Sequence, residues 1–192
     1  AEEIFVNSKQ DYPVLDVIKV IRPVPGHEII MANYFAVNEE HLKKWNPRVP
    51  KTHHSIDSWR RRLLERELEF DSGLSAHFIG TDEAESHVIG GCSLSNIVRG
   101  VFQACHMGYS IAQRYEGQGY MKKIVSHAVN FAFNDMKLHR IMANHMPENE
   151  KSAALLKRLG FEREGYAKDY LLINGQWEDH VLNALINPES RR

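Results

Sequence analysis

The sequence of 192 residues predicts one α/β domain, with a mixed antiparallel and parallel sheet flanked by helices. Three observations predict this class. Segments with the period of strands alternate with segments with the period of helices along the chain. A strand–helix–strand unit within residues 101–146 requires a parallel pair, whereas short turns elsewhere favour antiparallel pairs. The length suits a single domain, which we expect to span residues 1–192.

The N-terminal part is expected to hold one short strand and two helices. Residues 17–24 ("VIKVIRPV") form the strand, and residues 27–38 form the first helix. A polar loop with two prolines, residues 46–55 ("NPRVPKTHHS"), leads to the second helix, for which Ser55 is the predicted N-cap. The apolar residues of this second helix recur at helical spacing: Ile56, Trp59, Leu63 and Phe70.

Three strands are expected next, as an antiparallel meander. They are "SAHFIGT" (75–81), "HVIGGCSLSNIV" (87–98) and "VFQACHMGYSI" (101–111). Turn residues at 82–85 and 99–100 separate them. One face of the third strand carries alternating apolar side chains: Cys105, Met107, Tyr109 and Ile111.

The C-terminal part is expected to hold a helix of four or five turns, a strand, a short helix and a hairpin. The long helix has an apolar stripe made of Met121, Ile124, Val125, Ala128, Phe131, Ala132 and Met136. The strand is residues 140–146, and the short helix that follows has Asn149 as its cap and Gly160 as its stop. The strands 161–173 and 176–186 turn at Asn174-Gly175, a strong hairpin signal.

The overall charge and hydropathy exclude several classes of function. The net charge of −1 gives no reason to expect direct nucleic-acid binding. No apolar run approaches the roughly 18 residues of a membrane span, and the N-terminus lacks the pattern of a secretion signal. We therefore expect a cytoplasmic protein with no membrane association.

The two cysteines, Cys92 and Cys105, lie in strand-like runs and are expected to be buried and reduced. Cys105 and His106 are neighbours on a strand, so their side chains point to opposite faces and cannot easily share an ion. No zinc-ligand spacing occurs in the sequence, so no metal site is expected.

The stretch "QRYEGQGYM", residues 113–121, links the third meander strand to the long helix. N–H groups at a helix N-terminus lack helical partners and form an anion site suited to phosphate, which Gly117 and Gly119 would let approach closely. Arg114 adds a positive charge. A plain strand-to-helix turn is an alternative. A Rossmann motif would need a third glycine where Lys122 stands, and a P-loop would need Gly-Lys-Ser/Thr.

"RYEGQG" matches R/Q-x-x-G-x-G/A, the acetyl-CoA pyrophosphate signature of the GNAT N-acetyltransferases, which the chain resembles over nearly its whole length. "NIVRGVFQACHMGYSI" and "HRIMANHMPENEKSAALLKRLGFEREGYAKDYLLINGQWEDHVL" resemble the members that acetylate the N-terminal alanine of a ribosomal protein. The resemblance implies a single-domain GNAT fold with the sheet splayed in its middle. It implies acetyl-CoA as co-substrate and, as partner, the N-terminus of a ribosomal protein of the small subunit. A small-molecule amine acceptor (polyamine, amino acid or aminoglycoside) and a binding module for ribosome assembly are the alternatives.

The resemblance also implies which residues bind the co-substrate. The backbone of Tyr109, Ser110 and Ile111 would pair with the pantetheine arm. The pyrophosphate would be held by Arg114, Tyr115, Glu116, Gly117, Gln118, Gly119, Tyr120 and Met121. Asn149 and Ser152 match an Asn-x-x-Ser pattern in which Asn contacts the cofactor and Ser lies near its sulfur as the catalytic acid. Helix capping alone is the alternative role of both.

The sequence gives fewer indications of the catalytic base than of the residues that bind the co-substrate. An α-amino group has a pKa of about 8, so a weak base, or a carboxylate acting through water, suffices. Asp169 and Glu148 are the first carboxylates to consider. Four further side chains are left open as bases or proton donors: Tyr166, Tyr170, His106 and His145. Trp45, Trp59 and Trp177 are expected in the core or at its edges, and Trp45 lies in the loop that covers the acceptor side of this fold.

Overall fold

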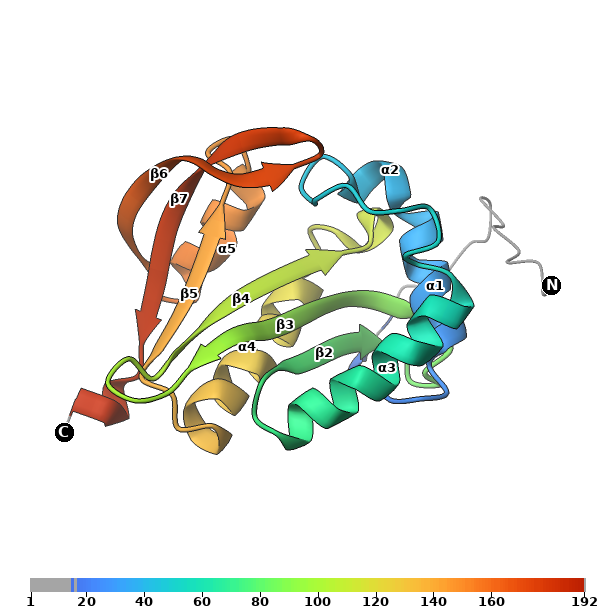
Figure 1. Ribbon diagram of the computed structural model, residues 1–192, viewed down its shortest axis with the longest axis horizontal. Helices are drawn as coiled ribbons and strands as arrows, with labels where there is room; N and C mark the ends of the chain where they lie inside the picture. Colours follow the sequence, from blue (N-terminus) through green and yellow to red (C-terminus); the bar gives the residue numbers. More distant parts are fainter. Residues whose placement is uncertain (1–14, 16, 192) are drawn as a thin grey trace.

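A seven-stranded sheet in the order β1-β2-β3-β4-β5-β7-β6 carries the fold (Figure 1). The computed structural model of the protein describes residue 15 and residues 17–191. Neighbouring strands pair antiparallel, except that β4 and β5 are parallel. The predicted mixed sheet, with its parallel pair around the strand–helix–strand unit, is confirmed.

The N-terminal elements are β1 (Lys19–Ile21), α1 (Glu28–Val37), α2 (Glu39–Leu42) and α3 (Ile56–Asp71). The hydroxyl of Ser55 accepts a hydrogen bond from the Ser58 N–H at 3.1 Å, which confirms the predicted N-cap. The strand is shorter than predicted because Pro23 has no N–H to donate to a ladder. Helix α2 was not predicted, since a single turn is too short to show a periodic pattern.

The meander consists of β2 (Ala76–Thr81), β3 (Val88–Val98) and β4 (Ala104–Ile111). The third strand begins at Ala104, so the prediction that it starts at residue 101 is wrong. The turn runs on through residue 103, where Gln103 has φ 47°. Val101 and Phe102 are exposed at the turn tip, and their apolar side chains were mistaken for the start of the strand.

Helix α4 (Tyr120–Asn130) continues into a π-helical turn, η2 (Phe131–Asp135), and covers the face of β2 and β3 opposite to α3. Its predicted apolar stripe is confirmed, with Ile124, Val125, Ala128 and Ala132 fully buried. Close packing depends on Gly80, where an added Cβ would lie 2.6 Å from Cδ1 of Ile124. Helix α4 therefore sits directly against the sheet backbone.

The chain ends with β5 (Arg140–His145), α5 (Glu150–Arg158), β6 (Glu162–Ile173) and β7 (Gln176–Ile186). The hairpin turn is confirmed: Asn174 and Gly175 have φ 47° and 82°, as a type I′ turn requires. Its tip contacts the loop before α3, because the Asn174 N–H donates to the Asn46 carbonyl at 2.9 Å. Figure 1 shows the β6–β7 hairpin reaching over toward α2.

The cysteines and tryptophans divide between core and surface. Cys92 and Cys105 are buried and unpaired, and burial raises the pKa of both thiols, that of Cys105 to about 12. Trp59 lies in the core as predicted, whereas Trp177 on β7 is exposed, which corrects its predicted core or edge position. Across the described residues, no group of three or more His, Cys, Asp or Glu side chains is arranged to hold a metal ion. None of the described helices combines the length and apolar character needed to cross a bilayer.

Candidate active site

Strands β4 and β5 pair only briefly and then separate. The parallel register runs from Ala104 opposite Arg140 to His106 opposite Met142. Beyond that point β4 continues to Ile111 and β5 to His145, and within the described chain nothing pairs with the facing edge of residues 107–111. The splay implied by the family resemblance is therefore present.

A cavity of about 350 Å³, here called the slot, occupies the splay. Its walls are the diverging strand ends, the first turn of α5, the loop with Trp45 and Asn46, and the β6–β7 hairpin. Trp45 therefore lines the slot. That its loop shapes a groove for the acceptor stays a prediction. No residue that lines the slot in the described chain is Asp or Glu.

Two hydroxyl groups meet inside the slot. The Tyr109 hydroxyl on β4 hydrogen-bonds to the Ser152 hydroxyl on α5, and Ser152 is only 8% exposed. Burial raises the pKa of Tyr109 to about 12, against a lowering by the Ser152 hydrogen bond. Tyr109 therefore keeps its proton at neutral pH, and the pair can supply a proton to an anion formed beside Ser152.

Asn149 lies next to this pair and lines the slot with it. Its side-chain oxygen accepts a hydrogen bond from the Ser152 N–H at 3.2 Å, so the predicted capping role is confirmed. The cap fixes the first turn of α5 and thereby the position of the Ser152 hydroxyl. A role of Asn149 toward the co-substrate stays a prediction.

Two buried histidines line the slot, His145 on β5 and His180 on β7. Nδ1 of His145 contacts the Met146 carbonyl at 2.9 Å, and Nδ1 of His180 contacts the Glu178 carbonyl at 3.0 Å. A carbonyl oxygen can only accept, so Nδ1 carries the proton in both rings. Nε2 is then the basic atom of each neutral ring. The sequence did not indicate His180 as a site residue. A periodic pattern does not show where a sheet splays, and so it does not show which side chains line the opening.

The carboxylates named from the sequence lie elsewhere. Asp169 is exposed in a bulge of β6 at φ 45°, and its N–H donates to Asp179 Oδ1 at 2.9 Å. The Tyr166 hydroxyl donates to Asp179 Oδ2 at 2.7 Å, also at the surface. Neither these residues nor the exposed Glu148 are among the described residues that line the slot. Tyr170 is closer to it, with its ring centroid 5.7 Å from that of His180.

The glycine loop, residues 113–119, follows β4 and leads into α4. Gly117 and Gly119 have φ 73° and 83°, and a Cβ added to either would meet nothing within 4 Å. The N–H groups of residues 119–122, at the start of α4, have no backbone acceptor among the described residues. The loop therefore presents free donors and open space at the positive end of α4, which fits a diphosphate.

The side chains of the loop are occupied in holding its shape. Glu116 forms an ion pair with Lys151 of α5 and lies 3.6 Å from His41 Nε2 of α2. The Gln118 side chain donates to the Arg114 carbonyl at 3.2 Å. These two side chains already have partners within the protein. The predicted contacts of Glu116 and Gln118 with a ligand would therefore be made by their backbone.

Neighbouring elements hold the segment before the glycine loop, residues 110–113, and the first turn of α4 in place. The Gln113 N–H donates to Asn38 Oδ1 at 3.0 Å, a buried support that no motif revealed. Ser110 hydrogen-bonds to the Tyr34 hydroxyl of α1 at 2.8 Å, and Ile111 ends β4. In the first turn of α4, the Tyr120 hydroxyl donates to the Leu15 carbonyl at 2.7 Å, and Met121 packs against the core.

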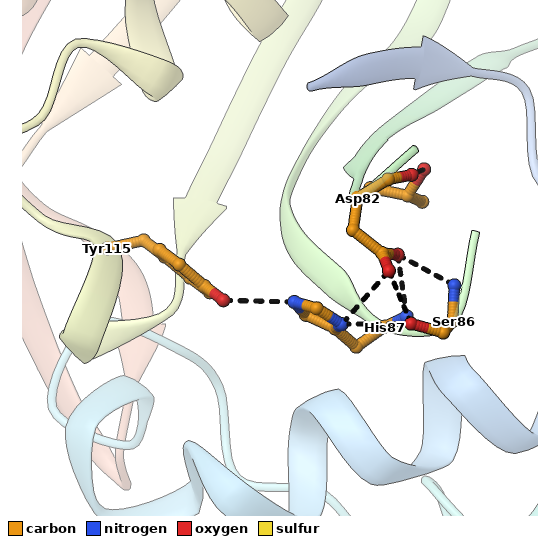
Figure 2. Close-up of polar contacts among 5 residues, drawn as sticks. Asp82, Ser86, His87 and Tyr115 are labelled. Carbon is orange, nitrogen blue, oxygen red and sulfur yellow. Dashed lines mark hydrogen bonds and ion pairs between the residues drawn. The ribbon is translucent and has the colours of Figure 1, made fainter. Parts of the chain in front are cut away.

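A polar cluster from the β2–β3 turn contacts the loop through Tyr115 (Figure 2). His87 Nε2 lies 2.9 Å from the Tyr115 hydroxyl, and His87 Nδ1 lies 3.6 Å from Asp82 Oδ2. Ser86 contacts the same Nδ1 at 3.2 Å, so the ring does not stand between serine and carboxylate as a hydrolase triad requires. Burial lowers the pKa of His87, and the neutral ring accepts the Tyr115 proton.

A sheet that splays between two parallel strands, with a free helix N-terminus beside the opening, is the arrangement that the resemblance to the GNAT N-acetyltransferases implied. The chain matches the Acetyltransferase (GNAT) domain over residues 20–162 and belongs to this family. The resemblance seen in the sequence is confirmed.

Three similar proteins show which members of the family the chain resembles. The chain is 47% identical to the [ribosomal protein uS5]-alanine N-acetyltransferase of Escherichia coli K12, over 83% of this chain and 82% of that protein. The crystal structure of ribosomal-protein-S5-alanine acetyltransferase from Vibrio fischeri is 40% identical, with a TM-score of 0.87 over 90% of this chain and 94% of the other. Mycobacterium smegmatis RimJ in complex with CoA-disulfide is 25% identical, with a TM-score of 0.81 over 91% and 84%.

Proposed function

We propose that this protein transfers the acetyl group of acetyl-CoA to the α-amino group of the N-terminal alanine of a ribosomal protein of the small subunit. The ribosomal acceptor is supported by the names of the E. coli and V. fischeri relatives, at 47% and 40% identity. Because the acceptor is a ribosomal protein, we expect the reaction in the cytoplasm.

One observation carries this proposal. The glycine loop with its free N–H groups follows the end of β4, the edge of β4 at residues 107–111 is unpaired, and Tyr109 on that edge contacts Ser152 inside the slot. Acetyl-CoA, when bound, supplies an activated acetyl thioester. The backbone of residues 109–111 would pair with the pantetheine arm, and that of residues 114–121 would hold the diphosphate.

The chain's own residues provide for the protons. We propose that His180 Nε2 accepts the amine proton, because Nδ1 is committed to the Glu178 carbonyl. Ser152 gives its proton to the departing thiolate, and Tyr109 donates to the Ser152 oxygen in turn. Asp169, predicted from the sequence, stays a second candidate base that would act through water.

The alternative acceptors lack an observation in their favour. A polyamine carries several positive charges, and a pocket that binds it needs carboxylates. The described lining of the slot has none. A pure binding module would have no use for the hydrogen-bonded hydroxyls of the buried Ser152 and the partly buried Tyr109 inside the slot.

The test is transfer of labelled acetyl groups to peptides that begin with alanine and to purified small-subunit ribosomal proteins, read by intact mass. We expect a gain of one acetyl group on the α-amine of one ribosomal protein. A peptide with a blocked N-terminus is the control and should gain none. Absence of transfer to any ribosomal protein or alanine peptide, with spermidine acetylated instead, would overturn the proposal.

A further inference from the structure

A second cavity, of about 280 Å³, lies on the opposite face of β4 from Ser152 and is here called the α3 cavity. It lies between helices α1 and α3 and strands β2 to β4. The slot and the α3 cavity share three lining residues: Asn46, Gly108 and Tyr109. A Cβ added at Gly108 would meet nothing within 4 Å, so the two cavities adjoin across this glycine.

The α3 cavity carries an uncompensated positive charge. Arg66 of α3 lines it, and burial, followed by the neighbouring Arg62, lowers the pKa of Arg66 to about 10, so the side chain is charged at neutral pH. Within residues 17–191, no carboxylate lies within 4.0 Å of a nitrogen of Arg66. Glu69 has the weakest influence on Arg66, and its carboxylate accepts a hydrogen bond from Ser75 at 2.6 Å.

Trp59 also lines the α3 cavity, next to Arg66. Trp59 is 1% exposed, and its Nε1–H has no hydrogen-bond partner among the described residues. Its ring is held by Arg62 at 3.8 Å and Arg66 at 4.9 Å from the centroid. A buried N–H without an acceptor is rare in native proteins because the lost hydrogen bond is unfavourable. Within the cavity, Arg66 is the charged group that a ligand with acceptor oxygens would satisfy, and the Trp59 ring lies directly beneath it.

The remaining polar groups of the cavity are neutral. His77 Nδ1 lies 2.7 Å from the Ser93 hydroxyl, and burial lowers the pKa of His77 to about 3. Tyr34 and Ser110 hydrogen-bond to each other. No Asp or Glu is among the described residues that line this cavity. Its chemistry therefore favours an anion with a flat, bidentate oxygen pair, which is the geometry of a carboxylate.

We propose that the α3 cavity is an acceptor subsite that binds the carboxylate of an acidic side chain close to the N-terminus of the protein substrate. The proposal rests on the acetyltransferase function proposed above. An amine placed in the slot would direct the following residues across Gly108, where one side chain can enter the cavity and reach Arg66 above the Trp59 ring. An acidic residue at that position then distinguishes the substrate from other alanine-initiated chains.

The experiment uses alanine-initiated peptides that differ only by Glu or Gln at one position from 2 to 5. We expect kcat/KM to be roughly tenfold or more higher with Glu than with Gln at one position, as for a charge-assisted hydrogen bond. Arg66→Met should bring this ratio close to one, and Arg66→Lys should keep part of it. Arg61→Met is the matched control, because Arg61 lies on the same helix with its side chain 71% exposed and should leave the ratio unchanged.

A binding measurement separates this proposal from the proposed function. In a Trp45→Phe, Trp177→Phe background, the fluorescence of Trp59 should respond to the Glu peptide with coenzyme A present, and not to the Gln peptide. Such a response, together with no acetyl transfer by the protein with all three tryptophans, would refute the function and keep the subsite. Transfer with equal rates for Glu and Gln, or an Arg66→Met defect equal for both peptides, would overturn the subsite and keep the function.

Discussion

The Tyr109 hydroxyl of β4 and the Ser152 hydroxyl of α5 hydrogen-bond across the slot, and so join the two walls that diverge where β4 and β5 separate. The contact connects residues 43 positions apart in the chain. It places two protonated hydroxyl groups beside the path proposed for the thioester.

Replacement of Ser152 by alanine should lower kcat roughly 10²-fold or more, with little effect on the KM for acetyl-CoA, because proton donation matters chiefly in the transition state. Tyr109→Phe should lower kcat less, since it weakens the donor without removing it. Steady-state kinetics measures both. Ser126→Ala, on α4 outside the slot, is the control. Unchanged kcat in Ser152→Ala would contradict the assignment.

Gly117→Val should raise the KM for acetyl-CoA more than tenfold, since a branched side chain fills the open space at the free N–H groups. Gly100→Val is a closely matched control. Gly100 has φ 68°, against 73° for Gly117, and neither glycine has a neighbour within 4 Å of an added Cβ. Both variants should lose about 1–2 kcal/mol of stability from backbone strain. A similar rise in KM for both would show that strain, not the ligand site, is responsible.

His180→Gln should lower kcat/KM roughly 10²-fold at pH 7, and the defect should shrink near pH 9. The reason is that an α-amino group with a pKa of about 8 has already lost its proton there. Asp169→Asn, at the exposed bulge of β6, tests the second candidate base. A pH–rate profile of each variant decides between them. If Asp169→Asn has the larger, pH-dependent defect, His180 is not the base.

His77 should make the protein sensitive to acid. Its pKa in the folded state is lowered from 6.5 to about 3, chiefly by burial and then by Arg66. The unfolded chain therefore binds the proton first as the pH falls below 6.5, and the stability is lost progressively down to pH 3. The loss attributable to His77 at pH 4.5 is about 2–3 kcal/mol. His77→Gln should narrow the difference in Tm between pH 7 and pH 4.5, whereas an unchanged difference would refute this origin.

His87→Ala should raise the KM for acetyl-CoA a few-fold while kcat changes little, because His87 positions the glycine loop through the Tyr115 hydroxyl. Tyr115→Phe should reproduce the effect. Ser126→Ala, on α4 and outside this cluster, serves as the control. If His87→Ala and Tyr115→Phe change KM additively in the double variant, His87 and Tyr115 do not act through one contact.

Much of the fold follows from local patterns. Ser55 and Asn149 were recognisable as caps, and Asn174-Gly175 as a hairpin turn, because each acts on neighbouring backbone groups. The extended turn at residues 99–103 was not recognisable, since exposed Val101 and Phe102 have the composition of a strand. Helix α2 was too short to show its period.

The candidate site also follows partly from local sequence patterns and partly from the tertiary structure. The order of residues along "RYEGQG" determines a helix start with free N–H groups, because the bonding of a helix N-terminus is a local property. The meeting of Tyr109 with Ser152, the inward position of His180 and the exposed position of Asp169 depend on where β4 and β5 stop pairing. The position of the charged Arg66 in a cavity against the sheet likewise arises only when α3 closes over the sheet. By itself the sequence determined the elements and the phosphate-binding backbone, because short-range forces specify them. Only the tertiary structure decided which side chains share a cavity, because burial and charge proximity come from segments distant in the chain.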